Sequence, residues 1–298
     1  MSLPQSEALR TSPPAGLPAR AELTTAQVPF HLQDDFLCGP ASLAMVFNAA
    51  GAPGTVETLK PLVYLPGREG SLQAEMLGAT RRSGLVAYPL APELESLLRE
   101  VAAGTPAVVL LNLTLMMFPV WHYAVAVGYD LERGTIIMRS GRRAREELSF
   151  GFLEFQWQDG GRWAMLALPP GRLPATAREA EFAAAVAAIE RTGRLQEARA
   201  SYRALLARWP TSLPGLFGLG NVEYALGDVA AAEAAFRRAT ESHPKSAPAF
   251  NNLAYVLASL GRFADAESTA RAAVALGGST LAESQKTLQA ILARSIRR

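Results

Sequence analysis

The chain contains one cysteine, Cys38, and three histidines, His31, His122 and His243. A single cysteine cannot form an intrachain disulfide, so Cys38 is a structural thiol, an intermolecular link or a nucleophile. Nucleophilic attack needs a thiolate, and an unassisted thiol with a pKa of about 8.5 is mostly protonated at neutral pH. The start of a helix and an imidazolium partner both lower that pKa, and the sequence places Cys38 to use both.

Cys38 directly precedes the segment GPASLAMVFNAA at residues 39–50, which we expect to be a helix. Pro40 suits a first helical turn, because the N–H that it lacks would have no intrahelical partner there. The apolar residues that follow indicate a buried helix with its N-terminal dipoles aimed at the Cys38 sulfur. We therefore expect the pKa of this thiol to be depressed.

His122 opens an apolar segment at residues 122–129, which we expect to be a central strand. A histidine on such a strand, facing the N-terminus of a helix, is the cysteine–histidine arrangement. We interpret His31 as structural and His243, which lies beside Pro244, as the C-terminal cap of a helix.

The residues around Cys38 and His122 carry a family resemblance. Val28-Pro29-Phe30, Gln33 and the segment CGPASLA from Cys38 resemble the nucleophile motif of the bacteriocin-leader-processing peptidases, papain-like enzymes that cut after double-glycine leaders. The segment HYAVAVGYD from His122 is similar to their histidine strand. The resemblance implies that Cys38 is the nucleophile, that His122 is its base and that Gln33 supplies the oxyanion hole together with the Cys38 backbone N–H. It also implies a peptide or protein substrate.

The sequence departs from this family at the third catalytic position. These peptidases place an aspartate, followed by a proline, at the end of the strand after the histidine strand, where it orients the imidazole. Here that strand is expected at residues 135–140, and the alignment puts Ser140 and Gly141 at the two positions. Serine accepts a hydrogen bond from imidazole but does not stabilise its positive charge as a carboxylate does. We expect Ser140 to lie within hydrogen-bond reach of His122 as the third member. Otherwise the chain has a weaker cysteine–histidine dyad, recruits another acceptor or is a non-catalytic relative.

Helices followed by a run of strands predict an α+β domain, which the resemblance implies to be papain-like, and a second part of the chain is expected to be all-α. The helices are expected at residues 39–50, 72–83 and 93–103, and the strands at 106–115, 122–129, 135–140 and near 162–168. We expect residues 1–22, rich in Pro, Ser and Ala, to be a flexible lead-in. The peptidase-like domain is expected at residues 23–172 and the repeat domain at residues 175–298.

The repeat domain is predicted from a period in the sequence. Gly193, Gly227 and Gly261 recur every 34 residues, and Pro210 and Pro244 keep the same step. This resembles the tetratricopeptide repeat, a helix–turn–helix of that length, as three units and a capping helix at residues 281–296. Such arrays usually hold an extended peptide or a partner protein in a groove lined by the first helix of each unit. The residues that we expect to bind this partner are Asn221, Tyr224, Asn251, Asn252 and Tyr255.

Composition excludes some classes of protein and suggests a location. The formal net charge of +2 argues against a nucleic-acid binder that depends on a basic field. One cysteine and three scattered histidines are a poor zinc-ligand set, and no cofactor motif is present, so we expect neither a metal nor a cofactor. Met1-Ser2-Leu3 resembles an expression-vector start, so we expect a native signal segment to have been removed. By resemblance we expect a bacterial envelope protein, periplasmic and lipid-anchored; the alternative is the cytoplasm.

Two functions remain open on these residues. The first is a cysteine peptidase that hydrolyses peptide bonds through Cys38 and His122 while its repeats dock a partner. The second is a non-catalytic, peptidase-like binding or adaptor protein, and a transglutaminase-like or acyltransferase use of the same dyad is a third option. Because all three share a fold, the fold class does not decide between them.

Overall fold

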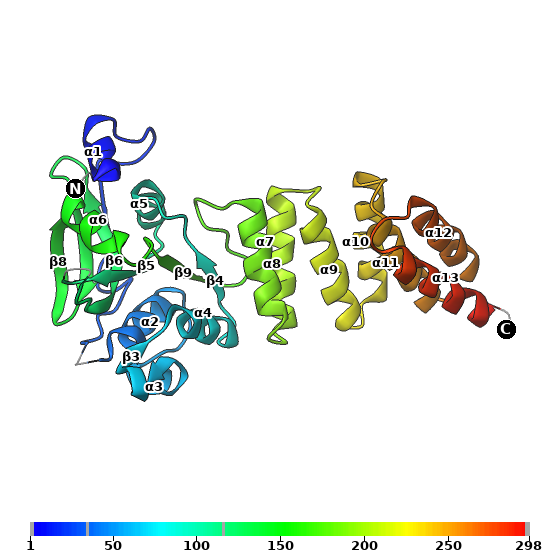
Figure 1. Cartoon of the computed structure of the whole chain (residues 1–298), viewed down its shortest axis with the longest axis horizontal. Helices are drawn as coiled ribbons and strands as arrows, with labels where there is room; N and C mark the ends of the chain where they lie inside the picture. The colour runs from blue at the N-terminus through cyan, green and yellow to red at the C-terminus, as the bar shows by residue number, and fades with distance from the viewer. Residues whose placement is uncertain (1–2, 34–35, 115–116, 296–298) are drawn as a thin grey trace. The chain divides into compact units, whose positions relative to one another are not determined.

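The computed structural model describes residues 3–33, 36–114 and 117–295. The last residue of the expected strand 106–115 and of the expected helix 281–296 lies outside these ranges. The chain divides into two compact units, Met1–Glu181 and Phe182–Arg298. The first unit combines helices with a sheet and the second is all-helical, which confirms the predicted fold class (Figure 1).

The first unit is built on a seven-stranded sheet whose paired strands are all antiparallel. Six strands follow the order β4-β9-β5-β6-β7-β8, and β1 pairs with the far end of β6. The strands are β1 (Arg20–Glu22), β4 (Val86–Pro89), β5 (Ala107–Asn112), β6 (Trp121–Asp130), β7 (Thr135–Ser140), β8 (Arg143–Ser149) and β9 (Ala164–Leu168). A separate hairpin consists of β2 (Tyr64–Leu65) and β3 (Gly70–Ser71), joined by the 3-10 turn Pro66–Arg68.

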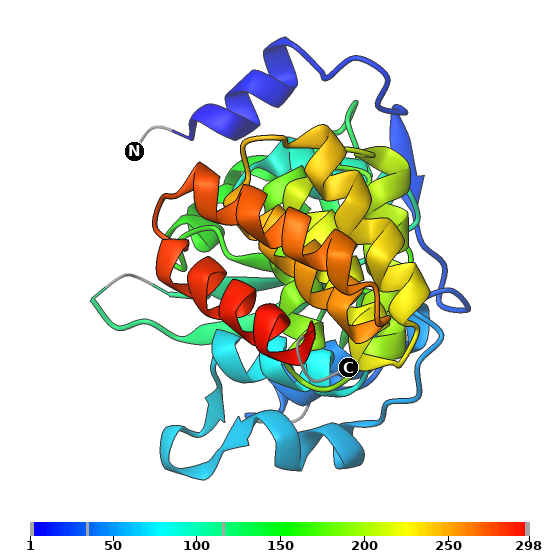
Figure 2. The same cartoon turned by 90° about the vertical axis from the view of Figure 1, so that its right-hand side faces the viewer.

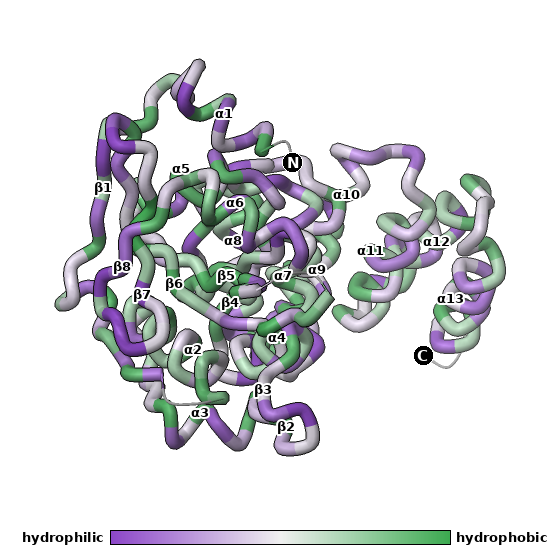
Figure 3. Tube along the Cα trace, turned by 60° about the vertical axis from the view of Figure 1, so that its left-hand side comes forward, coloured by the Kyte–Doolittle hydropathy of each residue, from purple (hydrophilic) through white to green (hydrophobic). Residues whose placement is uncertain are grey.

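Helices cover both faces of this sheet (Figure 1). The helices of the unit are α1 (Pro4–Thr11), α2 (Cys38–Ala49), α3 (Val56–Val63), α4 (Gln73–Arg82), α5 (Leu94–Ala102) and α6 (Phe150–Gln158). Helices α2 and α4 contact the sheet from one side, and α5 and α6 contact it from the other. Helix α2 is buried on almost every side, so its apolar sequence packs into the core with Val108, Val125 and Ile137 of the sheet. The outer strand β8 is hydrophilic, as expected for an edge (Figure 3).

Strand β6 is held on both sides by close neighbours. It pairs with β5 so that His122 lies opposite Leu111, and with β7 so that Val125 lies opposite Arg139. Gly128 lies where β1 approaches, and a Cβ there would come within 2.9 Å of the Ala21 carbonyl oxygen. Only glycine admits that approach without a shift of the backbone.

Residues 1–22, expected as a flexible lead-in, contain helix α1 and strand β1 in the part that the structure describes. Helix α1 is anchored by Glu154, a fully buried carboxylate that accepts the backbone N–H groups of Gln5 and Ser6 at 3.2 and 2.8 Å. An anion at the N-terminus of a helix satisfies donors that have no intrahelical partner. Because Glu154 lies far along the chain, the local composition of the segment gave no sign of this helix.

The second unit is a succession of helices that starts within α7, and from α8 to α13 each helix packs against the next (Figures 1 and 2). They are α7 (Glu179–Glu190), α8 (Leu195–Arg208), α9 (Leu213–Ala225), α10 (Val229–Ser242), α11 (Ala247–Ser259), α12 (Phe263–Leu276) and α13 (Leu281–Ser295). Small residues permit the contacts: a Cβ at Gly218 would lie 2.0 Å from the Tyr202 ring, and one at Gly220 would lie 2.5 Å from the Phe236 ring. Across the residues described in both units, no helix is long and apolar enough to span a lipid bilayer.

Candidate active site

Cys38 is the first residue of α2 and is only partly exposed. The next residue is Gly39, at a position that has no room for a side chain, because a Cβ there would lie 2.3 Å from the Ser71 hydroxyl oxygen. Burial raises the pKa of the Cys38 thiol, although the backbone N–H groups of Tyr123, Gly39 and Cys38 donate toward the sulfur and act in the opposite direction. The predicted depression of this pKa is therefore wrong, because desolvation of the thiolate outweighs the helix start.

His122, the second residue of β6, lines the same cleft as Cys38. The cleft has a volume of about 960 Å³, and Gln33, Trp121 and Gly141 also line it. The His122 Nε2 lies 3.1 Å from the hydroxyl oxygen of Ser140, the last residue of β7. Because Nε2 is engaged there, Nδ1 is the ring nitrogen left to exchange a proton with a thiol. The expected hydrogen bond between Ser140 and His122 is thus present.

The resting protonation state of Cys38 and His122 follows from two pKa shifts, both of which favour the neutral form of the side chain. Burial lowers the pKa of His122, and the charge of Glu146 on β8 only partly offsets this. With the thiol pKa raised and the imidazole pKa lowered, the favoured resting form has a neutral thiol and a neutral imidazole in the same cleft. Glu146 is the acid that acts on His122, and sequence reasoning missed it because strand β8 was not predicted. Its carboxylate is already paired with Arg143.

Gln33 is buried in a hydrogen-bond network instead of facing the cleft with free donors. Its Oε1 accepts the Gly141 N–H at 2.6 Å, which fixes the orientation of the amide. Its Nε2 donates to the Ser42 hydroxyl at 3.1 Å and to the Tyr123 carbonyl at 3.3 Å. The amide that we expected to serve the oxyanion hole therefore has other acceptors in this structure. The donors left near the sulfur are backbone N–H groups.

Ser42 completes this network and was not singled out from the sequence. It is fully buried in α2 and donates to the Tyr123 carbonyl at 3.2 Å. The network thus joins the helix of Cys38, the strand of His122 and the turn after Ser140. No periodicity or motif could have shown this, because the partners of Ser42 and Gln33 come from separate parts of the chain.

The other two histidines are engaged elsewhere. The His31 Nε2 lies 2.8 Å from the Asn48 Oδ1, so this residue is structural, as predicted. His243 is the C-cap residue of α10, and its Nε2 donates to the Thr211 carbonyl at 2.6 Å.

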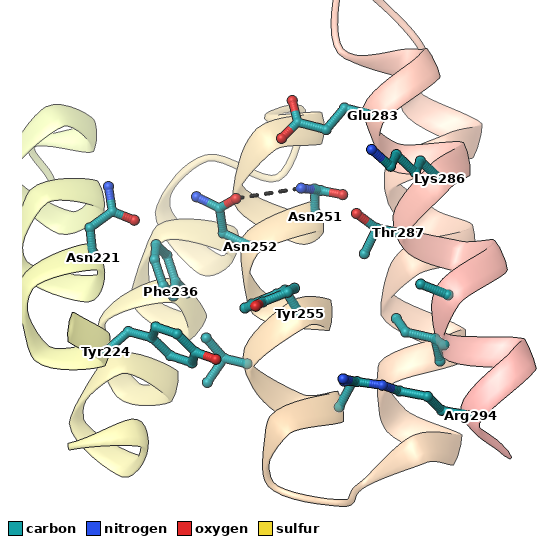
Figure 4. Close-up of a pocket in the computed structure, with 14 residues that line it drawn as sticks. Asn221, Tyr224, Phe236, Asn251, Asn252, Tyr255, Glu283, Lys286, Thr287 and Arg294 are labelled. Carbon is teal, nitrogen blue, oxygen red and sulfur yellow. Dashed lines mark hydrogen bonds between the residues drawn. The ribbon is translucent and has the colours of Figure 1, made fainter. Parts of the chain in front are cut away.

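The five predicted partner-binding residues all line one groove of the second unit (Figure 4). Its volume is about 540 Å³. Tyr224 and Tyr255 form one wall, with ring centroids 5.5 Å apart and planes at 61°. Residues of α13 form the opposite wall, among them Glu283, Lys286 and Arg294. We predicted α13 as a cap, and the structure adds that it lines the groove.

Comparisons with known proteins match both parts of the chain. Residues 25–159 match the Peptidase_C39-like family, and residues 179–212 and 217–279 match tetratricopeptide repeat models. None of the curated proteins matches the chain.

Solved structures similar to the chain include repeat proteins of low sequence identity. The Yersinia enterocolitica type III secretion chaperone SycD, in complex with a peptide of the translocator YopD, is 19% identical over 39% of this chain and 93% of that chain, with a TM-score of 0.37. A tetratricopeptide protein of Thermus thermophilus is 22% identical over 40% of this chain and 66% of that chain, with a TM-score of 0.36. The TPR2B domain of yeast Sti1, in complex with pHsp70, is 20% identical over 41% of this chain and 100% of that chain, with a TM-score of 0.38. From the family models, the chain joins a region that matches the Peptidase_C39-like family to regions that match tetratricopeptide repeats.

Proposed function

We propose that the first unit is a cysteine peptidase and that the groove of the second unit docks a peptide or protein. The observation that carries the peptidase proposal is that Cys38, at the start of α2, and His122, held by Ser140, line one cleft. A nucleophile and a base whose second nitrogen is held by a third group are the parts that acyl transfer requires.

The neutral resting pair sets the order of events. The His122 Nδ1 takes the thiol proton as the sulfur attacks the peptide carbonyl carbon, which leaves a negative charge on the carbonyl oxygen. Collapse of this intermediate breaks the carbon–nitrogen bond, forms a thioester, and returns the proton to the leaving amine. Water then attacks the thioester carbon while His122 takes one of its protons. The carbon–sulfur bond breaks, the acid product leaves, and His122 returns the proton to the sulfur.

The oxyanion needs donors that do not move during the reaction. The backbone N–H groups of Cys38 and Gly39 at the start of α2 are directed toward the sulfur, and the helical bond at this end runs from the Ala41 N–H to the Leu37 carbonyl. In this proposal the backbone provides the oxyanion site and Gln33 positions the histidine strand.

Reaction of the full chain with a peptide vinyl sulfone, followed by intact-mass spectrometry, tests the proposal. We expect one adduct on the unchanged protein, none on Cys38→Ala and a much slower reaction on His122→Ala. If Cys38 alkylates only after denaturation and no peptide electrophile reacts with the folded chain, the peptidase proposal fails.

The second candidate is a peptidase-like protein that binds peptides in this cleft without cutting them. Three observations favour it: the raised thiol pKa, Ser140 in place of a carboxylate, and the engaged amide of Gln33. Peptide binding that is the same for the unchanged protein and Cys38→Ala, without turnover by either, would support this candidate.

A further inference from the structure

We infer that the groove of the second unit binds a peptide segment through an acidic side chain, and that α13 selects this segment as well as closing the repeat array. The inference deepens the docking role proposed above and rests on it. The groove lies between α9 and α11 on one side and α13 on the other (Figure 4).

The floor of the groove carries a buried polar group that lacks a partner. Asn251 is only 7% exposed, and its Oδ1 accepts no hydrogen bond from any residue that the structure describes. Its Nδ2 makes a long contact of 3.5 Å to the Asn252 Oδ1. Because buried polar atoms are nearly always hydrogen-bonded, the acceptor at Asn251 is suited to an N–H group of a ligand. The backbone of an extended peptide offers such donors at regular intervals.

The wall formed by α13 carries two basic side chains that form no ion pair with a described residue. Lys286 and Arg294 line the groove, about 12 Å apart along the helix by its rise per residue. Within the described ranges, neither side chain forms an ion pair with a carboxylate, and Glu283 is the one acidic residue among those lining the groove. Other arginines of the unit, such as Arg237 and Arg271, are paired with glutamates on their own helices.

Arg294 and the two tyrosines form the more specific end of the groove. The positive charge of Arg294 acts on the hydroxyls of both Tyr224 and Tyr255. The Tyr224 hydroxyl also lies 3.2 Å from the Ser259 hydroxyl. A carboxylate placed here would accept a charge-assisted hydrogen bond from the guanidinium and another from a phenol. Phe236, Val256 and Ile291 also line the groove and would contact an apolar neighbour of that acid.

The ligand is therefore a peptide segment with an internal Asp or Glu beside an apolar residue. Selection of displayed random dodecapeptides tests this, because display leaves no free C-terminal carboxylate on the peptide. The full-length Cys38→Ala protein serves as the bait, with Tyr224→Ala/Asn251→Leu in the same background as the groove-damaged reference.

We expect sequences enriched over the reference to be rich in Asp and Glu. The double reversal Lys286→Glu/Arg294→Glu should weaken binding of a selected, fluorescein-labelled peptide at least tenfold. Lys245→Glu, a charge reversal outside the groove with half the charge change of the double variant, should leave it within twofold. The affinity should also fall as salt concentration rises.

Two failures are distinguishable. If no sequence is enriched over the groove-damaged reference, the docking role itself fails, and this inference fails with it. If sequences are enriched without acidic residues, or bind equally after the double reversal, docking stands and the inference is overturned. The peptidase proposal is untouched in either case, because the bait lacks the Cys38 sulfur.

Discussion

The hydrogen-bond network around His122 in the cleft and the groove of the second unit differ in how their polar groups are satisfied, although the Ser71 hydroxyl oxygen, which also lines the cleft, lacks a partner among the described residues. At the cleft, Gln33, Ser42, His122 and Ser140 hydrogen-bond to one another or to the backbone. In the groove, the Asn251 Oδ1 lacks a partner among the described residues, and Arg294 forms no ion pair with any of them. A satisfied network holds the protein's own reacting groups in place, whereas unsatisfied groups gain partners only when a ligand arrives.

The largest effect is expected at the reacting pair. Cys38→Ala should abolish peptide hydrolysis, and His122→Ala should lower its rate by about 10²- to 10⁴-fold, the usual contribution of a general base. The loss should appear mainly in kcat, since neither change alters most of the cleft. His31→Ala is the control, because His31 bonds to Asn48 and should leave the rate nearly unchanged. A rate that survives His122→Ala would show that the cleft does not hold the base.

The next effect tests whether the cleft network stabilises the fold. Ser42→Ala removes a buried hydroxyl and deprives the Gln33 amide of an acceptor, so the free energy of unfolding should fall by about 1–3 kcal/mol. Urea unfolding followed by tryptophan fluorescence reports on this, because Trp121, Trp157 and Trp163 lie in the first unit. The exposed Ser83, for which no side-chain bond is found among the described residues, gives the control Ser83→Ala, expected within 0.5 kcal/mol, or about the error of such measurements. Equal stability of the two variants would contradict the role of the network.

Sequence alone was sufficient wherever the signal was local or periodic. The helix after Cys38, expected at residues 39–50, is Cys38–Ala49, and the strand expected at 122–129 is Trp121–Asp130. A glycine, a proline or the end of an apolar run marks these boundaries, and each acts within a few residues. The period of 34 likewise predicted the repeat helices, and with them the five residues that line the groove.

What sequence missed depends on partners that are distant in the chain. Helix α1 is anchored by hydrogen bonds to Glu154, and hydrogen bonds to Gly141 and Ser42 orient the amide of Gln33. The direction of the Cys38 pKa shift was mispredicted because the helix start is visible in the sequence, whereas the burial that outweighs it is a property of the packed core. Local sequence thus identified the candidate groups, but tertiary packing decides their hydrogen bonds and charge.

A smaller effect concerns the charge of the cysteine–histidine pair. Since the thiol pKa is raised and the imidazole pKa lowered, alkylation of Cys38 by iodoacetamide should be slow at pH 7. Its rate should rise about tenfold per pH unit until the pH exceeds the thiol pKa, because only the thiolate reacts. Ser140→Asp adds a carboxylate beside His122, which raises the imidazole pKa and favours the ion pair. A shift of one pKa unit would speed alkylation at pH 7 about tenfold.

The matched control for this change is Ser140→Asn, which hydrogen-bonds to the imidazole without adding charge. It should leave the pH profile of alkylation close to that of the unchanged protein. Fast alkylation of the unchanged protein below pH 7 would instead show that the ion pair already exists. In that case Ser140 would only orient His122, and its lack of charge would matter little.

The smallest change in stability is expected in the groove, and its direction should be opposite to the change expected in the cleft. Asn251→Leu replaces a buried amide, whose Oδ1 has no partner in the described structure, by an apolar side chain of similar size. Removing an unsatisfied polar group relieves its desolvation cost, so the second unit should be unchanged or more stable by up to about 1 kcal/mol. Hydrogen exchange of α11, measured by mass spectrometry, reports this locally and should show equal or slower exchange.

Asn252→Leu is the comparison, because Asn252 is more exposed and its replacement should stabilise the unit less. The same Asn251→Leu protein should lose affinity for the selected peptides, so that stability and binding change in opposite directions. If Asn251→Leu instead exchanges faster, as expected for Ser42→Ala in the cleft, Asn251 belongs to a structural network and the contrast between the two regions does not hold.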